Sequence, residues 1–148
     1  VQKQRGGCLC GSVRFEATGD PARVAVCHCR YCQLRTGSAF GITVVYQTKL
    51  LKVQSGSFDT YSYTTGNNTK VEIKRCAKCG TSLFWKLDAD RFKGLIATAG
   101  GAYDPPTFWS KVDVEFFTRS KAPFCMIASQ ESFSSSPHYE PVNKEDDR

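Results

Sequence analysis

Apolar and polar residues alternate along much of the chain. Val112, Val114 and Phe116, for example, are separated by single charged residues. Alternation with a period of two predicts β-strands that bury one face and expose the other. This pattern, together with shorter apolar runs, predicts eight strands, at residues 13–17, 23–26, 40–46, 58–64, 69–75, 82–87, 95–98 and 111–116.

Helical segments are few and short. Residues 31–35 form one helix candidate that ends at Gly37, and residues 88–92 form another that ends at Gly94, because glycine commonly follows the last turn of a helix. Residues 65–68 lie between two predicted strands and have the sequence Thr-Gly-Asn-Asn, which predicts a hairpin turn. The pattern as a whole predicts a small all-β domain with few short helices.

Length and composition fit a single folded domain. The chain has 148 residues, of which 41% are hydrophobic and 23% charged. This is ordinary globular usage and excludes a wholly disordered or fibrous protein. Beyond residue 129 the sequence becomes rich in serine and then in charged residues. We therefore place the domain at residues 1–128 and expect a partly mobile C-terminal tail at residues 129–148, where Phe133 and Tyr139 are able to dock on the domain.

Neither a membrane nor a nucleic acid is an expected partner. The apolar stretches are far shorter than the roughly 20 residues needed to cross a bilayer. Residues 1–7 contain no apolar core of a signal peptide, and we expect a cytoplasmic protein. The formal net charge is +6 with every cysteine neutral, but seven thiolates on two Zn²⁺ ions bring it to roughly +3. The aromatic residues also do not alternate with Lys and Arg as they do in a base-stacking groove.

Seven of the eight cysteines fall into three short motifs. These are Cys-x-Cys at residues 8–10, Cys-x-Cys-x-x-Cys at residues 27–32 and Cys-x-x-Cys at residues 76–79. Closely spaced thiolates from distant parts of a chain are typical of tetrahedral zinc sites. Disulfides and a thioredoxin-like redox motif fit less well, because the chain is long enough to fold without cross-links and no long amphipathic helix lies near residues 76–79. The eighth cysteine, Cys125, lies between apolar residues and is expected to be buried.

The first and last motifs together provide one complete zinc site. Cys8 and Cys10 are two residues apart, so on an extended backbone both side chains point the same way. Cys76 and Cys79 converge through a tight turn, for which Gly80 is suitable. Four sulfur ligands enclose an ion fully, which is typical of a structural zinc.

The middle motif offers only three thiolates. Cys27, Cys29 and Cys32 would leave a fourth coordination position open, as in catalytic zinc sites. The spacing also allows a second division, in which these three cysteines share an ion with Cys76 and Cys79 while the first motif stays unbound.

Neither histidine is an expected ligand. His28 alternates with Cys27 and Cys29, so its side chain is expected to point away from an ion that they share. His138 lies in a segment rich in serine and proline, without metal-ligand neighbours.

Three motifs, in order along the chain, carry a family resemblance. They are GCLCGSVRF at residues 7–15, CHCRYCQLRTGSAF at residues 27–40 and RCAKCGTSL at residues 75–83. On these motifs the chain resembles the glutathione-dependent formaldehyde-activating enzyme and centromere protein V family, over residues 6 to about 127. The resemblance implies a zinc-binding β-tent of packed antiparallel sheets with two zinc ions per chain. It implies a structural zinc held by Cys8, Cys10, Cys76 and Cys79, and a more labile catalytic zinc held by Cys27, Cys29 and Cys32.

A zinc ion held by three thiolates suits a soft incoming ligand such as the thiol of glutathione. That thiol loses its proton at neutral pH and becomes available for carbon–sulfur bond making or breaking. Arginines near the metal are candidates for binding the carboxylates of glutathione, unless they are only solvated charges on a short helix. The candidate substrate-binding residues are the arginines Arg30 and Arg35 and the neutral hydrogen-bonding residues Gln33, Thr36 and Ser38.

The leading hypothesis is a zinc-dependent carbon–sulfur lyase or transferase. It would act on glutathione, or a similar thiol, and on an electrophile such as formaldehyde or a reactive metabolite. The alternatives are a non-catalytic, zinc-stabilised module that binds protein or chromatin, and a zinc or redox sensor that uses the three-thiolate site. The sequence leaves the oligomeric state open and allows a homo-oligomer.

Overall fold

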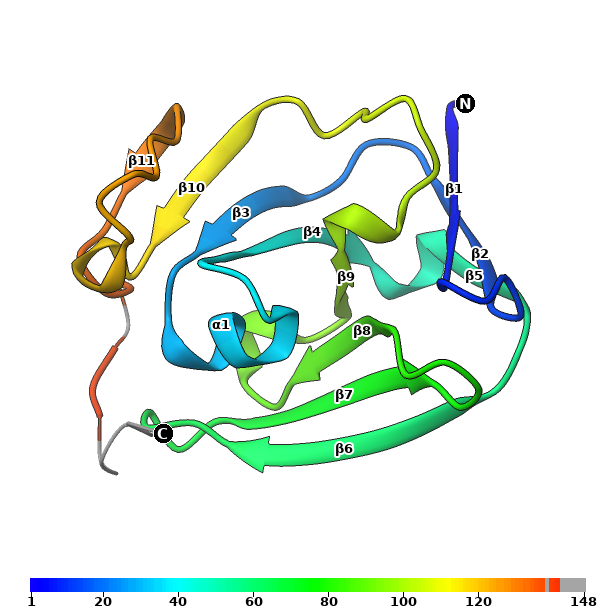
Figure 1. Cartoon of the computed structure of the whole chain (residues 1–148), viewed down its shortest axis with the longest axis horizontal. Coiled ribbons are helices and arrows are strands. Elements are labelled where there is room, and N and C mark those ends of the chain that lie inside the picture. The colour runs from blue at the N-terminus through cyan, green and yellow to red at the C-terminus, as the bar shows by residue number, and fades with distance from the viewer. Residues whose placement is uncertain (138, 142–148) are drawn as a thin grey trace.

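Two packed β-sheets form the computed structural model, which describes residues 1–137 and 139–141 (Figure 1). Its strands are β1 (Lys3–Gly7), β2 (Arg14–Thr18), β3 (Arg23–Cys27), β4 (Gly41–Gln47), β5 (Leu51–Ser55), β6 (Phe58–Thr64), β7 (Lys70–Cys76), β8 (Ser82–Leu87), β9 (Leu95–Ala99), β10 (Val112–Phe116) and β11 (Ser129–Ser132). The described helical elements are α1 (Arg30–Thr36) and the 3₁₀ turns Thr48–Leu50, Asp90–Phe92, Gly100–Ala102 and Thr118–Ser120. The larger sheet has the order β11-β10-β3-β4-β9-β8-β7-β6, and the smaller has the order β1-β2-β5. Within the described residues, no helix is long and apolar enough to cross a membrane.

The main core lies between the two sheets. Phe15 of β2 is fully buried there, and its ring centroid lies 5.0 Å from that of Phe84 and 5.1 Å from that of Tyr103. Burying one such side chain contributes about 1.5–3 kcal/mol to stability. The central strands of the larger sheet contribute alternate residues to this core, including Val24, Val44, Tyr46, Phe84 and Ile96.

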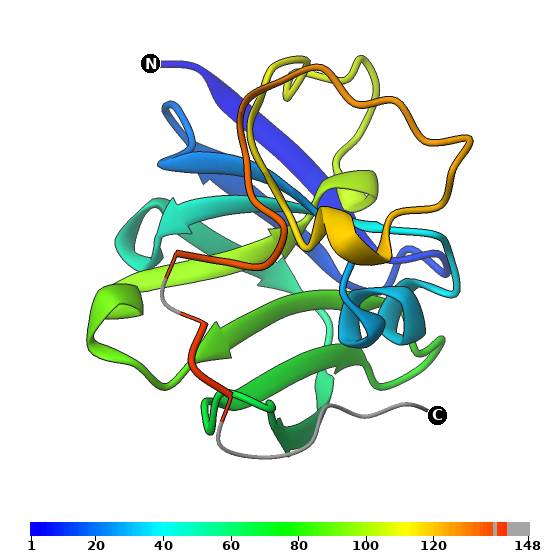
Figure 2. The same ribbon diagram turned by 90° about the vertical axis from the view of Figure 1, so that its left-hand side faces the viewer.

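The opposite face of the larger sheet carries the residues that alternate with those of the core. Ala25 follows Val24 in this way, and Val45 follows Val44. The C-terminal segment covers this face and reaches the turn between β6 and β7, where the backbone N–H of Glu140 donates to the side-chain oxygen of Asn67 (2.9 Å). Figure 2 shows this segment, in orange and red, passing in front of the strands.

The strands predicted from the alternation are all present, and each begins and ends within one residue of its predicted bounds. The helix predicted at residues 31–35 is α1, and Gly37 ends it in the left-handed region with a φ of 67°. The helix expected at residues 88–92 shortens to the 3₁₀ turn Asp90–Phe92. The all-β architecture of two packed sheets is confirmed.

The alternation does not predict β1, β5 and β11. The first contains two glycines, the second is mostly exposed, and the third has the polar sequence Ser-Gln-Glu-Ser. These strands belong to the sheets mainly through backbone pairing, although Leu51 of β5 also packs against the main core. Most described strand pairs are antiparallel, but β10 is parallel to both β3 and β11.

Part of the expected tail contacts the domain. Strand β11 lies within it and pairs with β10, while the ring of Phe133 stacks on that of Phe116 with centroids 6.0 Å apart. The ring of Tyr139 packs edge-on against that of Phe117 at 5.1 Å. Residues 142–148 of the expected tail lie outside the described residues.

Candidate metal centres and the adjoining cavity

The first cluster of thiols joins the loop after β1 to the turn between β7 and β8. The Sγ atoms of Cys8, Cys10, Cys76 and Cys79 lie within 4.8 Å of one another. Those of Cys8 and Cys10 are 3.5 Å apart, and those of Cys10 and Cys76 are 3.9 Å apart. Four sulfur ligands about 2.3 Å from a tetrahedral zinc ion are separated by about 3.8 Å. The cluster can therefore hold a metal ion, and its donors and spacing are consistent with zinc.

A tight turn after β7 brings Cys76 and Cys79 together. The Gly80 N–H donates to the carbonyl oxygen of Cys76 (2.9 Å), and Gly80 has a φ of 78°, which glycine adopts without strain. The N–H groups of Lys78 and Cys79 donate to Cys76 Sγ at 3.4 and 3.5 Å. The expected turn at Gly80 is confirmed.

Hydrogen bonds in this first cluster favour ionisation of Cys79 and Cys8, whereas the pKa of Cys10 is raised, because the lowering by Ser12 is outweighed by burial and by hydrogen bonds with Cys8 and Cys79. The side chain and backbone of Thr81 lower the pKa of Cys79 to about 5. Burial opposes ionisation of Cys8, but hydrogen bonds with the Val13 backbone and with neighbouring side chains lower its pKa to about 7. Because cysteine binds metals as the thiolate, these contacts prepare Cys79 and Cys8 for metal binding.

The second cluster lies where β3 leads into α1. Cys27 is the last residue of β3, Cys29 caps the helix, and Cys32 lies in its first turn. Their Sγ atoms lie within 4.8 Å of one another, and the Cys32 N–H donates to Cys29 Sγ at 3.5 Å. Among the described residues, no other histidine, cysteine or carboxylate joins this group. His138 lies outside the described residues.

The seven cysteines thus form a group of four and a group of three. This is the first of the two divisions that the sequence spacing allows. The second division, with the thiols of β3 and α1 sharing an ion with those of residues 76–79, is not formed in the described chain. Cys125 stands apart and is buried, as expected.

The three thiols of the second cluster differ in acidity. Hydrogen bonds from Cys27 and Cys29 hold the pKa of Cys32 well below its usual value, although burial opposes this, and the charge and a hydrogen bond of Arg35 add to the lowering. The pKa of Cys27 is raised, because it makes hydrogen bonds to Cys29 and Cys32 and is buried. The first thiolate of this cluster therefore forms at Cys32.

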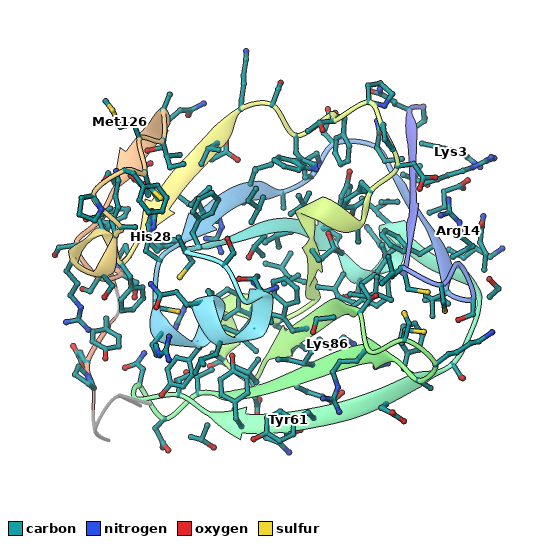
Figure 3. The ribbon with its side chains drawn as sticks, in the orientation of Figure 1. Lys3, Arg14, His28, Tyr61, Lys86 and Met126 are labelled. Carbon is teal, nitrogen blue, oxygen red and sulfur yellow. The ribbon has the colours of Figure 1, made fainter. Side chains whose placement is uncertain are left out.

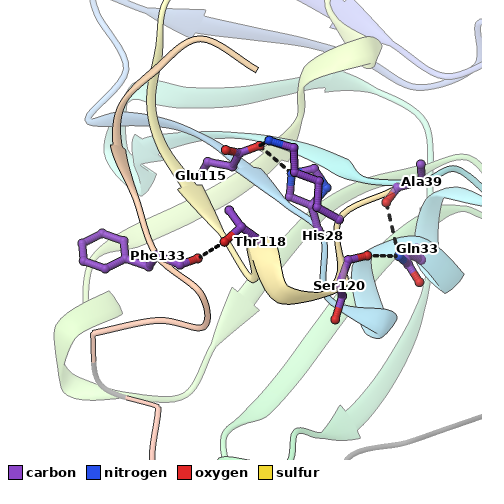
Figure 4. Close-up of polar contacts among 8 residues, drawn as sticks. His28, Gln33, Ala39, Glu115, Thr118, Ser120 and Phe133 are labelled. Carbon is purple, nitrogen blue, oxygen red and sulfur yellow. Dashed lines mark hydrogen bonds and ion pairs between the residues drawn. The ribbon is translucent and has the colours of Figure 1, made fainter. Parts of the chain in front are cut away.

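His28 does not join the thiols and is fully buried. Its Nε2 lies 2.7 Å from a carboxylate oxygen of Glu115, and Lys121 Nζ lies 3.3 Å from the same oxygen (Figure 4). The His28 ring also packs edge-on against Phe40 at 5.7 Å. These contacts connect the junction of β3 and α1, and hence the second cluster, to β10.

Replacing Glu115 by glutamine is expected to lower the free energy of unfolding by about 1–3 kcal/mol. The amide keeps the shape of the side chain but removes the charge that His28 and Lys121 contact in a buried position. Urea unfolding of the metal-loaded protein measures the change. Glu131→Gln on exposed β11 is the matched control and should change stability by less than about 0.5 kcal/mol. Equal effects in both variants would argue against a role for the buried contact.

A cavity of about 460 Å³ lies on the face of the larger sheet that points away from the main core. All three thiols of the second cluster line it, together with Arg30. Its floor includes Val45 and Trp85, and Phe117 and Tyr139 contribute to its cover. The volume falls in the range of small-molecule sites, about 300–1,000 Å³.

The candidate arginines have different surroundings. Arg30 lines the cavity beside the thiols. The guanidinium of Arg35 stacks on Trp85 at 3.7 Å from the ring centroid. Together with Thr36 and Ser38, Arg35 borders a second, shallower hollow of about 820 Å³. Of these four candidates, the structure therefore places Arg30 alone along the cavity that holds the three thiols.

The neutral candidates make hydrogen bonds within the region of α1. The Gln33 side-chain amide donates to the carbonyl oxygens of Ala39 (3.4 Å) and Ser120 (3.5 Å) (Figure 4). The Thr36 hydroxyl donates to the carbonyl oxygen of Cys32 at 2.8 Å. These bonds hold the helix and the loop that follows it.

Several cavity residues were not singled out by the sequence. Tyr63 and Trp85 occupy alternate positions of predicted strands, and alternation assigns such residues to a buried face without saying what that face contacts. The strand order of the sheet is what places them in the cavity that the thiols line.

Comparison with known proteins identifies the family of this chain. A crystal structure of a Rhodobacter sphaeroides protein is similar, with a TM-score of 0.55 and 19% sequence identity over 73% of this chain and 96% of that chain. At this identity the likeness concerns the fold alone. A family model described as glutathione-dependent formaldehyde-activating enzyme matches residues 3–120, a span that contains all seven clustered cysteines. The chain therefore belongs to the glutathione-dependent formaldehyde-activating enzyme family.

Proposed function

We propose that the protein is a zinc-dependent carbon–sulfur lyase or transferase. It acts on glutathione, or a similar thiol, and on an electrophile such as formaldehyde or a reactive metabolite. The observation that carries the proposal is the convergence of Cys27, Cys29 and Cys32 beside a cavity, with no fourth protein ligand among the described residues. Three protein ligands leave a coordination position for a substrate. Family membership supports glutathione as the thiol.

Two zinc ions per chain are part of this proposal. The four-thiol cluster would hold a structural ion, and the three-thiol cluster would hold the catalytic one. Zinc in the three-thiol cluster supplies a Lewis acid that lowers the pKa of an incoming thiol. None of the eight cysteines forms a disulfide, and we propose a cytoplasmic location, where thiols stay reduced and available to bind metal.

Residues around the three-thiol cluster have separate proposed roles. Arg30 binds a carboxylate of glutathione through a charge-assisted hydrogen bond. Burial, together with the negative charges at Cys32 and Cys29, raises the pKa of Tyr63, so its phenol stays protonated and can donate to an oxygen that gains charge. Arg35 positions Cys32 through its charge and hydrogen bond.

The remaining candidates have a supporting role in this proposal. Gln33 and Thr36 stabilise α1 and the loop after it. The backbone N–H of Ser38 donates to the Thr36 hydroxyl at 3.1 Å, which orders the same loop.

With formaldehyde, the reaction is an addition. The thiol sulfur forms a bond to the carbonyl carbon, the electron pair of the carbonyl π bond moves to oxygen, and the thiol proton ends on that oxygen. The product is S-hydroxymethylglutathione, and the reverse reaction returns both reactants. The balance requires no oxidant or reductant.

The proposal is tested by metal analysis and by exchange kinetics on the purified full chain. We expect two zinc ions per chain and at least a tenfold increase, about 1.4 kcal/mol of barrier lowering, in the rate of glutathione addition to formaldehyde or to an α,β-unsaturated aldehyde. NMR exchange spectroscopy measures the first rate, and loss of ultraviolet absorbance measures the second. A non-catalytic module predicts the uncatalysed rate with both electrophiles, and that result would overturn the proposal.

A further inference from the structure

Arginines lie at both ends of the cavity. Its described lining contains three arginines, Arg23, Arg30 and Arg91, and no aspartate or glutamate. Arg30 flanks the second cluster, between Cys29 and Cys32. Arg23 begins β3, whereas Cys27 ends it, so Arg23 lies at the far end of the cavity. Arg91 is near Arg23, because their charges interact.

Arg23 lacks a complete set of partners. Its Nε is buried and has no hydrogen-bond partner among the described residues, and its guanidinium lies 5.5 Å from the ring centroid of Phe116. Burial lowers the pKa of Arg23. The charge of Asp113 raises this pKa, whereas the charge of Arg91 lowers it further. Asp113 accepts the Val24 N–H at 2.7 Å and does not line the cavity. A buried guanidinium nitrogen with a second cation nearby is suited to an anionic ligand.

Strand geometry fixes the separation between this cationic end and the thiols. Arg23, Ala25 and Cys27 all line the cavity, so they point to the same face of β3. A strand advances about 3.3 Å per residue, which places Arg23 roughly 13 Å from Cys27 along the backbone. A ligand that contacts both ends is therefore elongated, with on the order of 10 Å between its sulfur and its anionic group once the arginine side chain is allowed for.

The walls between the two ends are mainly apolar and aromatic. Val45, Trp85 and Ala97 contribute from the sheet, and Phe92 and Phe116 also line this part of the cavity. These surfaces favour a flat apolar group, because its burial is favourable and aromatic rings stack on it.

We propose that the substrate is an S-conjugate of glutathione whose electrophile-derived part is an elongated aromatic or apolar group ending in a carboxylate or similar anion, bound by Arg23 and Arg91. This inference rests on the proposed function, since it names the electrophile of that reaction. In the lyase direction the carbon–sulfur bond breaks and its electron pair stays on sulfur. The C–H bond of the neighbouring carbon also breaks: its electron pair forms the new carbon–carbon double bond and its proton ends on the sulfur, so the products are glutathione and an unsaturated acid. Formaldehyde would leave the far end without a ligand.

Two unreactive conjugates test the far end by calorimetric titration of the zinc-loaded full chain. They are S-(4-phenylbenzyl)glutathione and the same molecule with a carboxylate on the outer ring. We expect the carboxylate to increase affinity at least about tenfold in the wild type. In Arg23→Gln this gain should disappear, while the affinity for free glutathione stays within about twofold.

Two further variants keep the result interpretable. Arg91→Gln alters an exposed residue, so it should fold normally and lose part of the same gain. Arg75→Gln is the matched control, because Arg75 lies outside the cavity lining and next to Tyr61, which is 53% exposed at the edge of the molecule (Figure 3). It should bind all ligands like the wild type. Equal affinity of the wild type for the two conjugates, or an equal loss of glutathione binding in Arg23→Gln, would overturn the inference.

A third probe separates this inference from the proposed function. Biphenyl-4-carboxylate has no thiol, so its binding needs neither the metal nor the reaction. We expect it to bind wild type and Cys32→Ser equally and Arg23→Gln at least about tenfold more weakly. Binding of this probe without any catalysed thiol reaction would refute the proposed function while retaining the anion-binding end. A catalysed reaction without binding of the probe would refute the anion-binding end alone.

Discussion

Replacing Cys32 by serine is expected to reduce the catalysed addition of glutathione at least about 100-fold, with the fold retained. Cys32 carries the most acidic thiol of the second cluster, and serine offers no thiolate for a metal. The main core lies on the other face of the larger sheet, so its packing does not depend on this side chain. Metal analysis should show one zinc per chain instead of two, and exchange NMR should give the uncatalysed rate.

Cys29→Ser provides an independent check of the same site. Cys29 caps α1 by accepting the N–H of Cys32, and serine is itself a good N-cap residue, so the helix start is preserved. Loss of activity in this variant therefore reports on the metal site and not on the helix. Cys125→Ala is the control for removing a buried cysteine outside both clusters. Full activity in Cys32→Ser and Cys29→Ser would contradict a catalytic role for the cluster.

Replacing Cys76 by serine is expected to lower the free energy of unfolding by on the order of 5 kcal/mol or more, since binding of a structural zinc contributes about 10–16 kcal/mol in zinc-finger peptides. Cys76 is 1% exposed, and its sulfur accepts two backbone N–H groups and lies close to Cys10. The variant loses the link between the loop after β1 and the turn after β7. Thermal unfolding followed by circular dichroism measures the effect.

A chelator gives the matched comparison for this second prediction. Wild-type protein treated with a strong chelator should unfold at a temperature close to that of Cys76→Ser, because both have lost the ion of the four-thiol cluster. The chelator should change Cys76→Ser little. If Cys76→Ser without chelator unfolded at the same temperature as the untreated wild type, a structural role for this cluster would be contradicted.

Alternation along the chain was sufficient to place the central strands of the larger sheet. It succeeded for β4 and β9 because each has one face in the main core and the other toward the cavity or its surroundings. It failed for β1 and β5, whose residues are held by backbone pairing along β2. Alternation records the burial of side chains, whereas edge strands depend mainly on which backbone lies beside them.

The spacing of the cysteines likewise suggested their division but did not decide it. Cys8 and Cys10 are separated from Cys76 by more than sixty residues, and the sequence also allowed the thiols of residues 27–32 to join the turn after β7. The fold brings the loop after β1 beside that turn, where Cys10 and Cys76 come within 3.9 Å. Local spacing determines which thiols point the same way, and the packing of the sheets determines which of them meet.

By itself, the sequence determined the all-β class, the strands of the larger sheet with alternating burial and the local geometry of each cysteine motif, because these depend on residues a few positions apart. Only the tertiary structure decided that Arg91 lies at the same cavity as Arg23 and the three thiols. The order of strands in the larger sheet and the path of the C-terminal segment over it produce that arrangement. Such contacts depend on segments far apart along the chain, so no local pattern encodes them.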